Sequence, residues 1–178
     1  MDHSVARVRR AGPDDASAIG DVHAESWLRA YVDILDPEFV ARAAEGRRVG
    51  WASRIRLLLT APNTLLVAEL DSGICAFAHA GPANSDVSVG EVYGFYSRPE
   101  VWGTGVAGLL MEAVCAELGA VWQEAVLWTM RDAKRARTFY EKAGWYLTGE
   151  EKLEPLSDWM TRTTATPPAV EYRRWLTR

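Results

Sequence analysis

A glycine-rich stretch at residues 98–108 carries the residue types that bind a phosphate group. It contains Pro99 and, shortly after it, Gly103, Gly105 and Gly108. Glycine adopts backbone angles that other residues resist, so a loop of this kind can present several amide groups to one ligand. If a helix begins inside the loop, its first amides are unpaired and its dipole places positive charge there. The stretch therefore predicts a site for a phosphate or a pyrophosphate.

The segments on either side of this stretch have the patterns that such a site requires. Residues 87–96 are rich in valine and aromatic residues, which favours a strand. Pro99 ends that strand because proline has no N–H group for a ladder. From Val106 to Leu118 the apolar residues recur at helical spacing, and Gly119 ends the predicted helix. The expected order is therefore strand, glycine-rich loop and helix N-terminus.

The remaining elements follow from the same kinds of pattern. Strands are predicted at 5–9, 65–70, 74–79, 124–130, from 145 onward and at 169–176. Helices are predicted from Asp14 or Asp15 to about 31, from 36 to 59 with an interruption near 46–50, and at 133–143. This mixture predicts an α/β (α+β) fold with a mixed, largely antiparallel sheet, rather than a doubly wound one.

The composition argues for one ordinary globular domain over residues 1–178. Apolar residues make up 48% of the chain and charged residues 25%, which argues against disorder. The net charge of −4, from 20 basic and 24 acidic residues, gives no basic surface for nucleic acid or for an anionic membrane. It mildly favours a cationic or amine substrate. We therefore expect neither nucleic acid nor membrane as a partner.

The cysteines and the N-terminal residues bear on the compartment. Cys75 and Cys115 are expected to be buried free thiols, because each lies in an apolar segment. Their number and spacing indicate neither a disulfide framework nor a metal site. No apolar stretch is long enough to span a bilayer, and the N-terminal residues lack the apolar core of a signal peptide. We expect a cytoplasmic protein.

Two stretches of the chain resemble the signatures of the GNAT N-acetyltransferase superfamily. Residues 91–99 followed by 102–107 are similar to its acyl-CoA signature, Arg/Gln-x-x-Gly-x-Gly/Ala at a strand-to-helix turn. Residues 131–145 are similar to a later motif, and residues 9–35 to the start of many bacterial members. The resemblance covers nearly the whole chain. It implies a GNAT-type sheet with helices on both faces, and acetyl-CoA as co-substrate without a metal.

The resemblance also implies which residues hold the cofactor. Amides of the loop would bind the pyrophosphate, and the end of the preceding strand would splay from its neighbour and pair with the pantetheine arm. Trp102 stands where Arg or Gln is usual, and Ala133 stands where an Asn is common. The expected cofactor-binding residues are Phe95, Tyr96, Ser97, Trp102, Gly103, Thr104, Gly105, Val106 and Ala107.

Acetyl transfer to an amine needs a polarised thioester carbonyl, a neutral amine and a proton for the leaving thiolate. Tyr140 is the candidate general acid, because the family often has a tyrosine at this place near the thiol sulfur. Glu91 is the candidate base, either directly or through water, because a mostly apolar neighbourhood would raise its pKa. His23 and His79 are alternatives for the base.

The acceptor site is expected at the first helices, with His23, Trp27 and Tyr31 as substrate-binding residues. The acceptor would be a small molecule or a peptide that carries a primary amine, and a homodimer is plausible. A non-catalytic acyl-CoA-binding or sensor domain on the same fold is the main alternative. A nucleotide-binding protein of another fold is a weaker one, because no Lys-Ser/Thr pair follows the glycines.

Overall fold

One seven-stranded mixed sheet forms the centre of the computed structural model, which describes residues 6–157 and 164–176. Its strands lie in the order β1-β2-β3-β4-β5-β9-β6. Their bounds are Arg7–Arg10 (β1), Thr64–Leu70 (β2), Gly73–Pro82 (β3), Gly90–Ser97 (β4), Glu124–Met130 (β5), Pro168–Trp175 (β9) and Tyr146–Leu153 (β6). All neighbours are antiparallel except β4 and β5, which run parallel. The predicted mixed, largely antiparallel sheet is confirmed.

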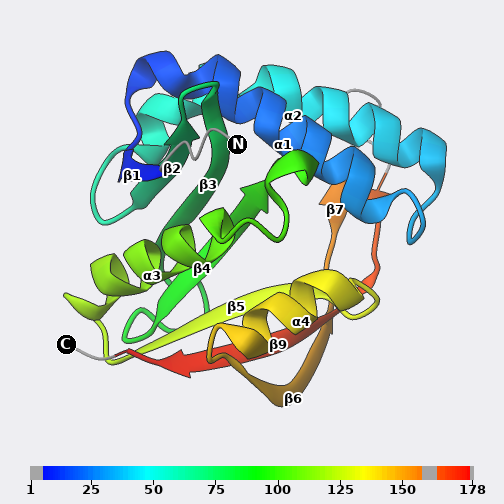
Figure 1. Ribbon diagram of the computed structural model, residues 1–178. Coiled ribbons are helices and arrows are strands. Elements are labelled where there is room, and N and C mark those ends of the chain that lie inside the picture. The colour runs from blue at the N-terminus through cyan, green and yellow to red at the C-terminus, as the bar shows by residue number, and fades with distance from the viewer. Residues whose placement is uncertain (1–5, 158–163, 177–178) are drawn as a thin grey trace.

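In the described part of the chain, four α-helices cover the two faces of this sheet (Figure 1). They are α1 (Ala16–Tyr31), α2 (Pro37–Leu58), α3 (Val106–Gly119) and α4 (Lys134–Lys142). On one face, Val67 of β2 packs with Ile19 of α1 and Ile55 of α2. On the other face, the adjacent Leu66 belongs to the same core as Leu110 of α3. Successive strand residues point to opposite faces, so one strand serves both cores and the expected helices on both faces are confirmed.

The two parallel strands separate along their length. Their pairing is confined to Gly90–Val92 of β4 and Ala125–Leu127 of β5, and beyond it the strands diverge (Figure 1). At this point the register between β3 and β4 shifts, so that Tyr93 of β4 is an extra residue. A bulge bends a strand and increases its twist. The bend therefore lies where β4 turns away from β5, and it opens the sheet.

The predicted interruption of the second helix near residues 46–50 is wrong. Helix α2 runs without a break from Pro37 to Leu58, and Gly46 is buried within it. A glycine of the neighbouring helix α1 packs against this part of α2. A Cβ atom placed on Gly20 of α1 would lie 2.3 Å from the backbone oxygen of Arg48 in α2. Glycine thus lets the two helices approach closely.

Other boundaries differ by a few residues from those predicted. The strand expected from residue 87 begins at Gly90, because Asp86 accepts hydrogen bonds from the amides of Ser88 and Val89 and holds them in a turn. The predicted start of the first strand, at residue 5, lies outside the described residues. Short elements with too few residues for a repeating pattern were not predicted: η1 (Pro13–Asp15), η2 (Pro99–Val101), β7 (Leu156–Ser157) and β8 (Thr164–Ala165).

Candidate active site

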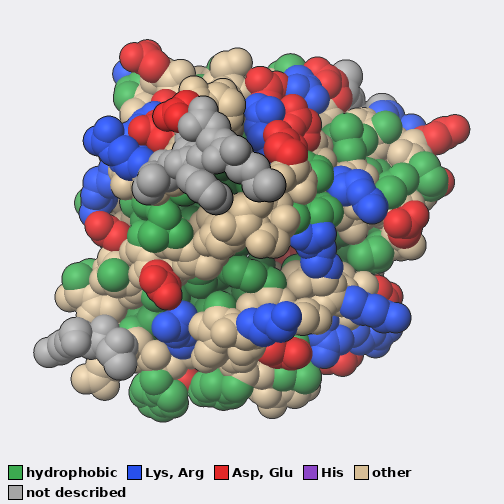
Figure 2. Space-filling view, in the orientation of Figure 1, with side chains coloured by type: hydrophobic (Ala, Val, Ile, Leu, Met, Phe, Trp, Pro, Cys, Tyr) green, Lys and Arg blue, Asp and Glu red, His purple; other side chains and the backbone are tan. Residues whose placement is uncertain are grey.

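A cavity of about 740 Å³ lies where β4 and β5 diverge. Its walls come from the end of α1, from β4, from the loop before α3, from the end of β5, from α4 and from parts of the segment between β6 and β9. Figure 2 shows the surface hollowed between its upper and lower halves, with Lys and Arg side chains at the rim. This volume is within the usual range for small-molecule and cofactor sites. Elements from both halves of the chain meet here.

The loop between β4 and α3 presents unpaired backbone amides. Gly103 and Gly105 have φ angles of 79° and 93°, a region that favours glycine. The amides of Trp102 and Thr104 donate within the preceding turn. By contrast, the amides of Gly103, Gly105 and residues 106–108 have no acceptor in the described part of the chain. With the positive end of the α3 dipole, they form an anion-binding arrangement.

Most of the expected cofactor-binding residues line the cavity, namely Phe95, Tyr96, Ser97, Trp102, Gly103 and Ala107. Thr104, Gly105 and Val106 do not line it. The Val106 side chain is buried in the core beneath α3, and the Thr104 hydroxyl donates to the carbonyl of Val101 at 2.7 Å. For Gly105 and Val106, only the backbone amides remain available to a ligand.

Tyr140 lines the cavity from α4, although its side chain is only 8% exposed. Beside it, Phe139 stacks on Phe95 of β4, with ring centroids 5.4 Å apart. The Tyr140 hydroxyl has no hydrogen-bond partner among the described residues. Burial raises the pKa of Tyr140 well above its usual range, so the group keeps its proton at neutral pH. Tyr140 is therefore a proton donor without a competing protein acceptor.

Glu91 lies at the start of β4 and also lines the cavity. Its carboxylate accepts a hydrogen bond from the amide of Asn84 at 3.2 Å. Burial raises the pKa of Glu91, and the hydrogen bond from Asn84 and the charge of Lys152 only partly offset this rise. The nearby carboxylates of Glu154 and Glu171 add a smaller contribution in the raising direction. The neighbouring Lys152 forms its ion pair with Glu154, at 2.8 Å. Glu91 is thus a half-buried carboxylate whose affinity for a proton is increased, as a general base requires.

Trp27 and Tyr31 line the cavity from α1, as expected for the acceptor side. Their rings meet edge to face, with centroids 4.7 Å apart. The indole N–H of Trp27 donates to the hydroxyl of Tyr96 at 3.4 Å, and the Arg47 guanidinium lies 3.4 Å from the centroid of the Trp27 ring. This side of the cavity therefore has aromatic walls that suit the apolar part of an acceptor.

The structure does not bring the two histidines into the cavity. His23 is buried, and its Nδ1 accepts a hydrogen bond from the indole of Trp51 at 3.1 Å. Burial lowers the pKa of His23 well below its usual range, and burial lowers that of His79 to about 4. The ring of His79 packs against Tyr93 at 4.9 Å. The expectation that His23 contacts the substrate is not supported, because the side chain is enclosed between α2 and the sheet.

The cavity is also lined by residues that were not predicted from the sequence, among them Trp128, Arg135 and Lys152. The Lys152 ammonium lies 4.3 Å from the centroid of the Trp128 ring. These two residues come from different strands, and no pattern along the chain places them together. Arg135 lies inside the second family-like stretch, and its position there is the one signal that could have drawn attention to it.

Neither a metal centre nor a membrane span was found in the part of the chain that the structure describes. Within residues 6–157 and 164–176, no group of three or more His, Cys, Asp or Glu side chains could hold a metal ion. No helix in these ranges is long and apolar enough to cross a membrane.

Comparisons with known proteins agree with the geometry. Residues 61–147 match a family model described as the acetyltransferase (GNAT) domain. This range includes β4, the glycine-rich loop, α3 and α4. No curated protein sequence matches the chain.

Several solved structures share the fold over nearly the whole chain. PaiA N-acetyltransferase from Thermoplasma acidophilum, solved in complex with coenzyme A, is 19% identical with a TM-score of 0.70, covering 96% of this chain and 99% of that one. A GCN5-related N-acetyltransferase structure from Rhodopseudomonas palustris is 18% identical, with a TM-score of 0.73 and 99% of each chain covered. The yncA protein from Salmonella typhimurium, solved with its cofactor acetyl-CoA, is 16% identical, with a TM-score of 0.64, covering 98% of this chain and 96% of that one.

At these identities the structural matches establish the fold, and the family model adds the domain. Residues 61–147 carry a GNAT acetyltransferase domain, and the resemblance seen in the sequence is confirmed.

Proposed function

We propose that this protein is a GNAT-family enzyme that transfers the acetyl group of acetyl-CoA directly to a primary amine, with both substrates bound together. The observation that carries the proposal is the single cavity through the diverging strands. It brings the loop before α3 and Tyr140 of α4 into one space with Glu91 and the aromatic residues of α1. A thioester bound from one side and an amine bound from the other would meet between β4 and β5.

The residues present fit the phosphate-bearing part of acetyl-CoA. The free amides of Gly103, Gly105 and residues 106–108 match the acceptor oxygens of a pyrophosphate. Past Val92, the edge of β4 that faces β5 has no strand partner, so backbone groups there are available to the amides of the pantetheine arm. The carbonyl of Ser97 is an exception, because it already accepts from Trp102 and Ser26. When bound, acetyl-CoA supplies the activated acetyl group.

The remaining steps belong to side chains of this protein. Glu91 would accept a proton from the acceptor ammonium, directly or through water, since a raised pKa lets its carboxylate hold that proton. As the amine nitrogen bonds to the acetyl carbon and the carbon–sulfur bond breaks, Tyr140 would donate its hydroxyl proton to the leaving sulfur, since the hydroxyl has no other partner among the described residues. The phenolate would then regain a proton from the nitrogen of the new amide, directly or through water. Trp27 and Tyr31 would hold the acceptor and exclude water from it.

A calorimetric titration with acetyl-CoA tests cofactor binding, with Ala107→Glu as the blocking variant. Ala107 lies in the first turn of α3. The helix dipole stabilises a carboxylate at this position, so the variant should fold, but the carboxylate would repel a phosphate. We expect the natural protein to bind and the folded variant to bind at least tenfold more weakly. Ala116→Glu changes the net charge equally, and Ala116 is an exposed residue in the last turn of the same helix, so binding should persist.

Release of free CoA in the presence of a panel of primary amines tests the chemistry. Release that depends on the amine supports direct transfer. Tight binding without amine-dependent release at any pH between 6 and 9 would instead favour the non-catalytic acyl-CoA-binding or sensor domain. Failure to bind CoA, together with binding of ATP, would favour a nucleotide-binding protein.

A further inference from the structure

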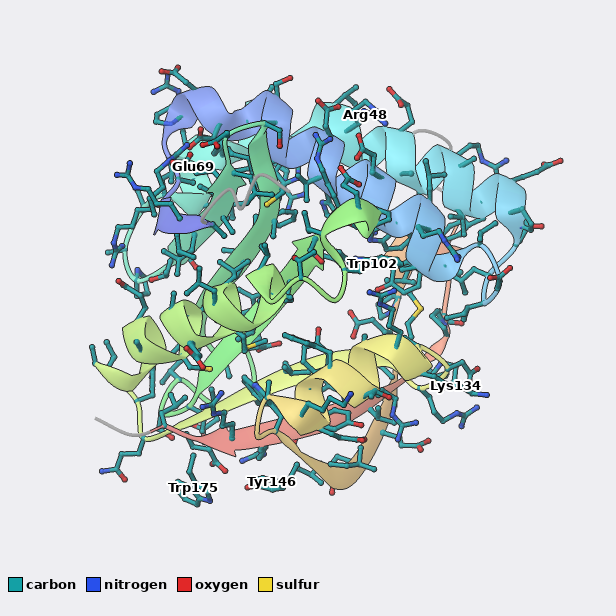
Figure 3. All side chains as sticks on the ribbon, viewed as in Figure 1. Arg48, Glu69, Trp102, Lys134, Tyr146 and Trp175 are labelled. Atoms are coloured by element: carbon teal, nitrogen blue, oxygen red, sulfur yellow. The ribbon has the colours of Figure 1, made fainter. Side chains whose placement is uncertain are left out.

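Trp102 and Arg135 form a stacked pair at the cavity. The guanidinium carbon of Arg135 lies 3.3 Å from the centroid of a Trp102 ring, and both residues line the cavity. Trp102 belongs to the loop before α3, and Arg135 to the first turn of α4. Figure 3 shows Trp102 between that loop and the start of α4, where Lys134 is also labelled. The pair therefore joins the two elements on either side of the cavity.

The orientation of Trp102 is fixed independently of this stacking. Its indole N–H donates to the carbonyl of Ser97 at 3.0 Å, which ties the ring to the end of β4. A guanidinium over an indole face is held by the ring quadrupole while its N–H groups stay free to donate. Trp102 therefore acts as a platform that positions the Arg135 charge beside the loop.

Arg135 has no anionic partner among the described residues. Burial lowers the pKa of Arg135, and the charge of Arg29 acts in the same direction. Two other cations of the cavity differ in this respect, since Arg29 lies 4.0 Å from Asp33 and Lys152 pairs with Glu154. Lys134 and Lys142 also line the cavity, but neither stacks on Trp102 in the described part of the chain. An uncompensated guanidinium next to unpaired amides is an arrangement that an anion would complete.

We propose that Arg135, held over Trp102, binds the pyrophosphate of CoA and supplies the side-chain contact that the loop itself lacks. The inference rests on the proposed function. Trp102 is adjacent to Gly103, whose free amide begins the anion-binding loop. A guanidinium stacked on Trp102 therefore lies beside the anion-binding loop. The aromatic residue thus recruits a cation from α4 instead of providing a polar group of its own.

The experiment measures dissociation constants of CoA, dephospho-CoA and pantetheine for the natural protein, for Arg135→Ala and for Lys134→Ala. Dephospho-CoA retains the pyrophosphate but lacks the 3′-phosphate, and pantetheine has no phosphate. We expect Arg135→Ala to weaken the binding of CoA and of dephospho-CoA equally, by about tenfold or more. The dissociation constant of pantetheine should be unchanged. Lys134→Ala removes an adjacent charge that does not stack on Trp102, so it should change each constant less than threefold.

A second pair of variants tests the role of Trp102. In the Trp102→Arg background the loop carries its own cation, so adding Arg135→Ala should now raise the dissociation constant of CoA less than threefold. In the Trp102→Leu background the aromatic platform is lost, and Arg135→Ala should again change the dissociation constant of CoA only slightly.

Each unfavourable result has a distinct meaning. If Arg135→Ala weakens CoA but not dephospho-CoA, the guanidinium contacts the 3′-phosphate and the proposal is wrong. If both ligands bind the variant as tightly as the natural protein, Arg135 has no role and only this inference falls. If the natural protein itself binds no CoA, the proposed function falls with it.

Discussion

Glu91 shows what burial does to a single residue at this site. Burial raises the pKa of its carboxylate, despite the hydrogen bond from Asn84 and the nearby charge of Lys152. The sequence placed the residue at a strand start with apolar surroundings, and the raised pKa agrees with that expectation. Its part as a general base stays a prediction.

We expect Glu91→Gln to lower kcat by about 10²–10⁴-fold, which is the usual contribution of a general base. A base works when it is deprotonated, so the natural enzyme should lose activity as the pH falls through the raised pKa. The pH profile of kcat/KM checks this, and the acidic limb should be absent in the variant. Glu154→Gln is the comparison, because Glu154 lines the same cavity and is paired with Lys152. Removing its charge should shift the acidic limb to lower pH but should not abolish it, since Glu154 only adds to the raised pKa of Glu91.

Tyr140 gives a second test of the role of a single residue. Its hydroxyl has no partner among the described residues, so Tyr140→Phe should leave the melting temperature within about 2 °C of the natural protein. The affinity for CoA should also be kept. If the hydroxyl protonates the leaving sulfur, kcat falls by about 10²-fold or more. An unchanged kcat for an amine acceptor would assign that proton to another group.

At the scale of elements, the position of α1 depends on its close contact with α2. The acceptor-side residues Trp27 and Tyr31 lie on α1, so its packing decides the shape of that wall. The hydroxyl of Ser26 also donates to the carbonyl of Ser97 at 2.9 Å, which ties α1 to the end of β4.

Gly20→Ala should destabilise the protein by about 1–3 kcal/mol, because the new methyl group would overlap the backbone of Arg48. Thermal or urea unfolding measures the change. Gly108→Ala in α3 is the matched control, since a Cβ atom there meets nothing within 4 Å. The control should be neutral or gain up to about 1 kcal/mol from helix propensity. Equal losses in both variants would show that the contact between the helices is not the cause.

At the scale of the whole molecule, buried neutral histidines link stability to pH. In the unfolded chain a histidine has a pKa near 6.5, whereas His79 in the fold has a pKa of about 4. Between these values the unfolded chain binds a proton that the folded protein does not. The stabilising contribution of a neutral His79 is therefore full above pH 6.5 and is lost as the pH falls towards 4.

We expect the free energy of unfolding to fall by up to about 3 kcal/mol through His79 alone between pH 7 and pH 4. His79→Phe removes the titrating group and keeps a ring beside Tyr93, so its stability should depend less steeply on pH. Urea unfolding at several pH values compares the two proteins. If the free energy of unfolding depends on pH equally in both proteins, His79 is solvated in the folded state.

Two properties of the whole molecule are still only predictions from the sequence. These are the cytoplasmic location and the homodimer. Tyr146 and Trp175 are exposed to 45% and 66% on the sheet end formed by β6 and β9, where Figure 3 labels them close together. Sedimentation would decide whether a second copy covers them.

The sequence by itself determined the longer helices and strands, although not the unbroken course of α2, as well as the class of sheet and the glycine-rich loop before α3. These features depend on local patterns: apolar periodicity, proline and glycine positions, and the order of strand, loop and helix. The family resemblance added most of the cavity residues of β4 and the loop, as well as Tyr140. Residues with the same local signals but different surroundings, such as His23 and Trp27, could not be told apart.

Only the tertiary structure decided which of these side chains reach the cavity. The opening depends on where β4 and β5 stop pairing, and that point is set by contacts between strands far apart in the chain. The same holds for Trp128 with Lys152 and for Trp102 with Arg135, which meet through packing rather than through spacing. Burial and charge at a site are sums over all neighbours in space, so the raised pKa of Glu91 and the lowered pKa of His23 follow from the fold as a whole.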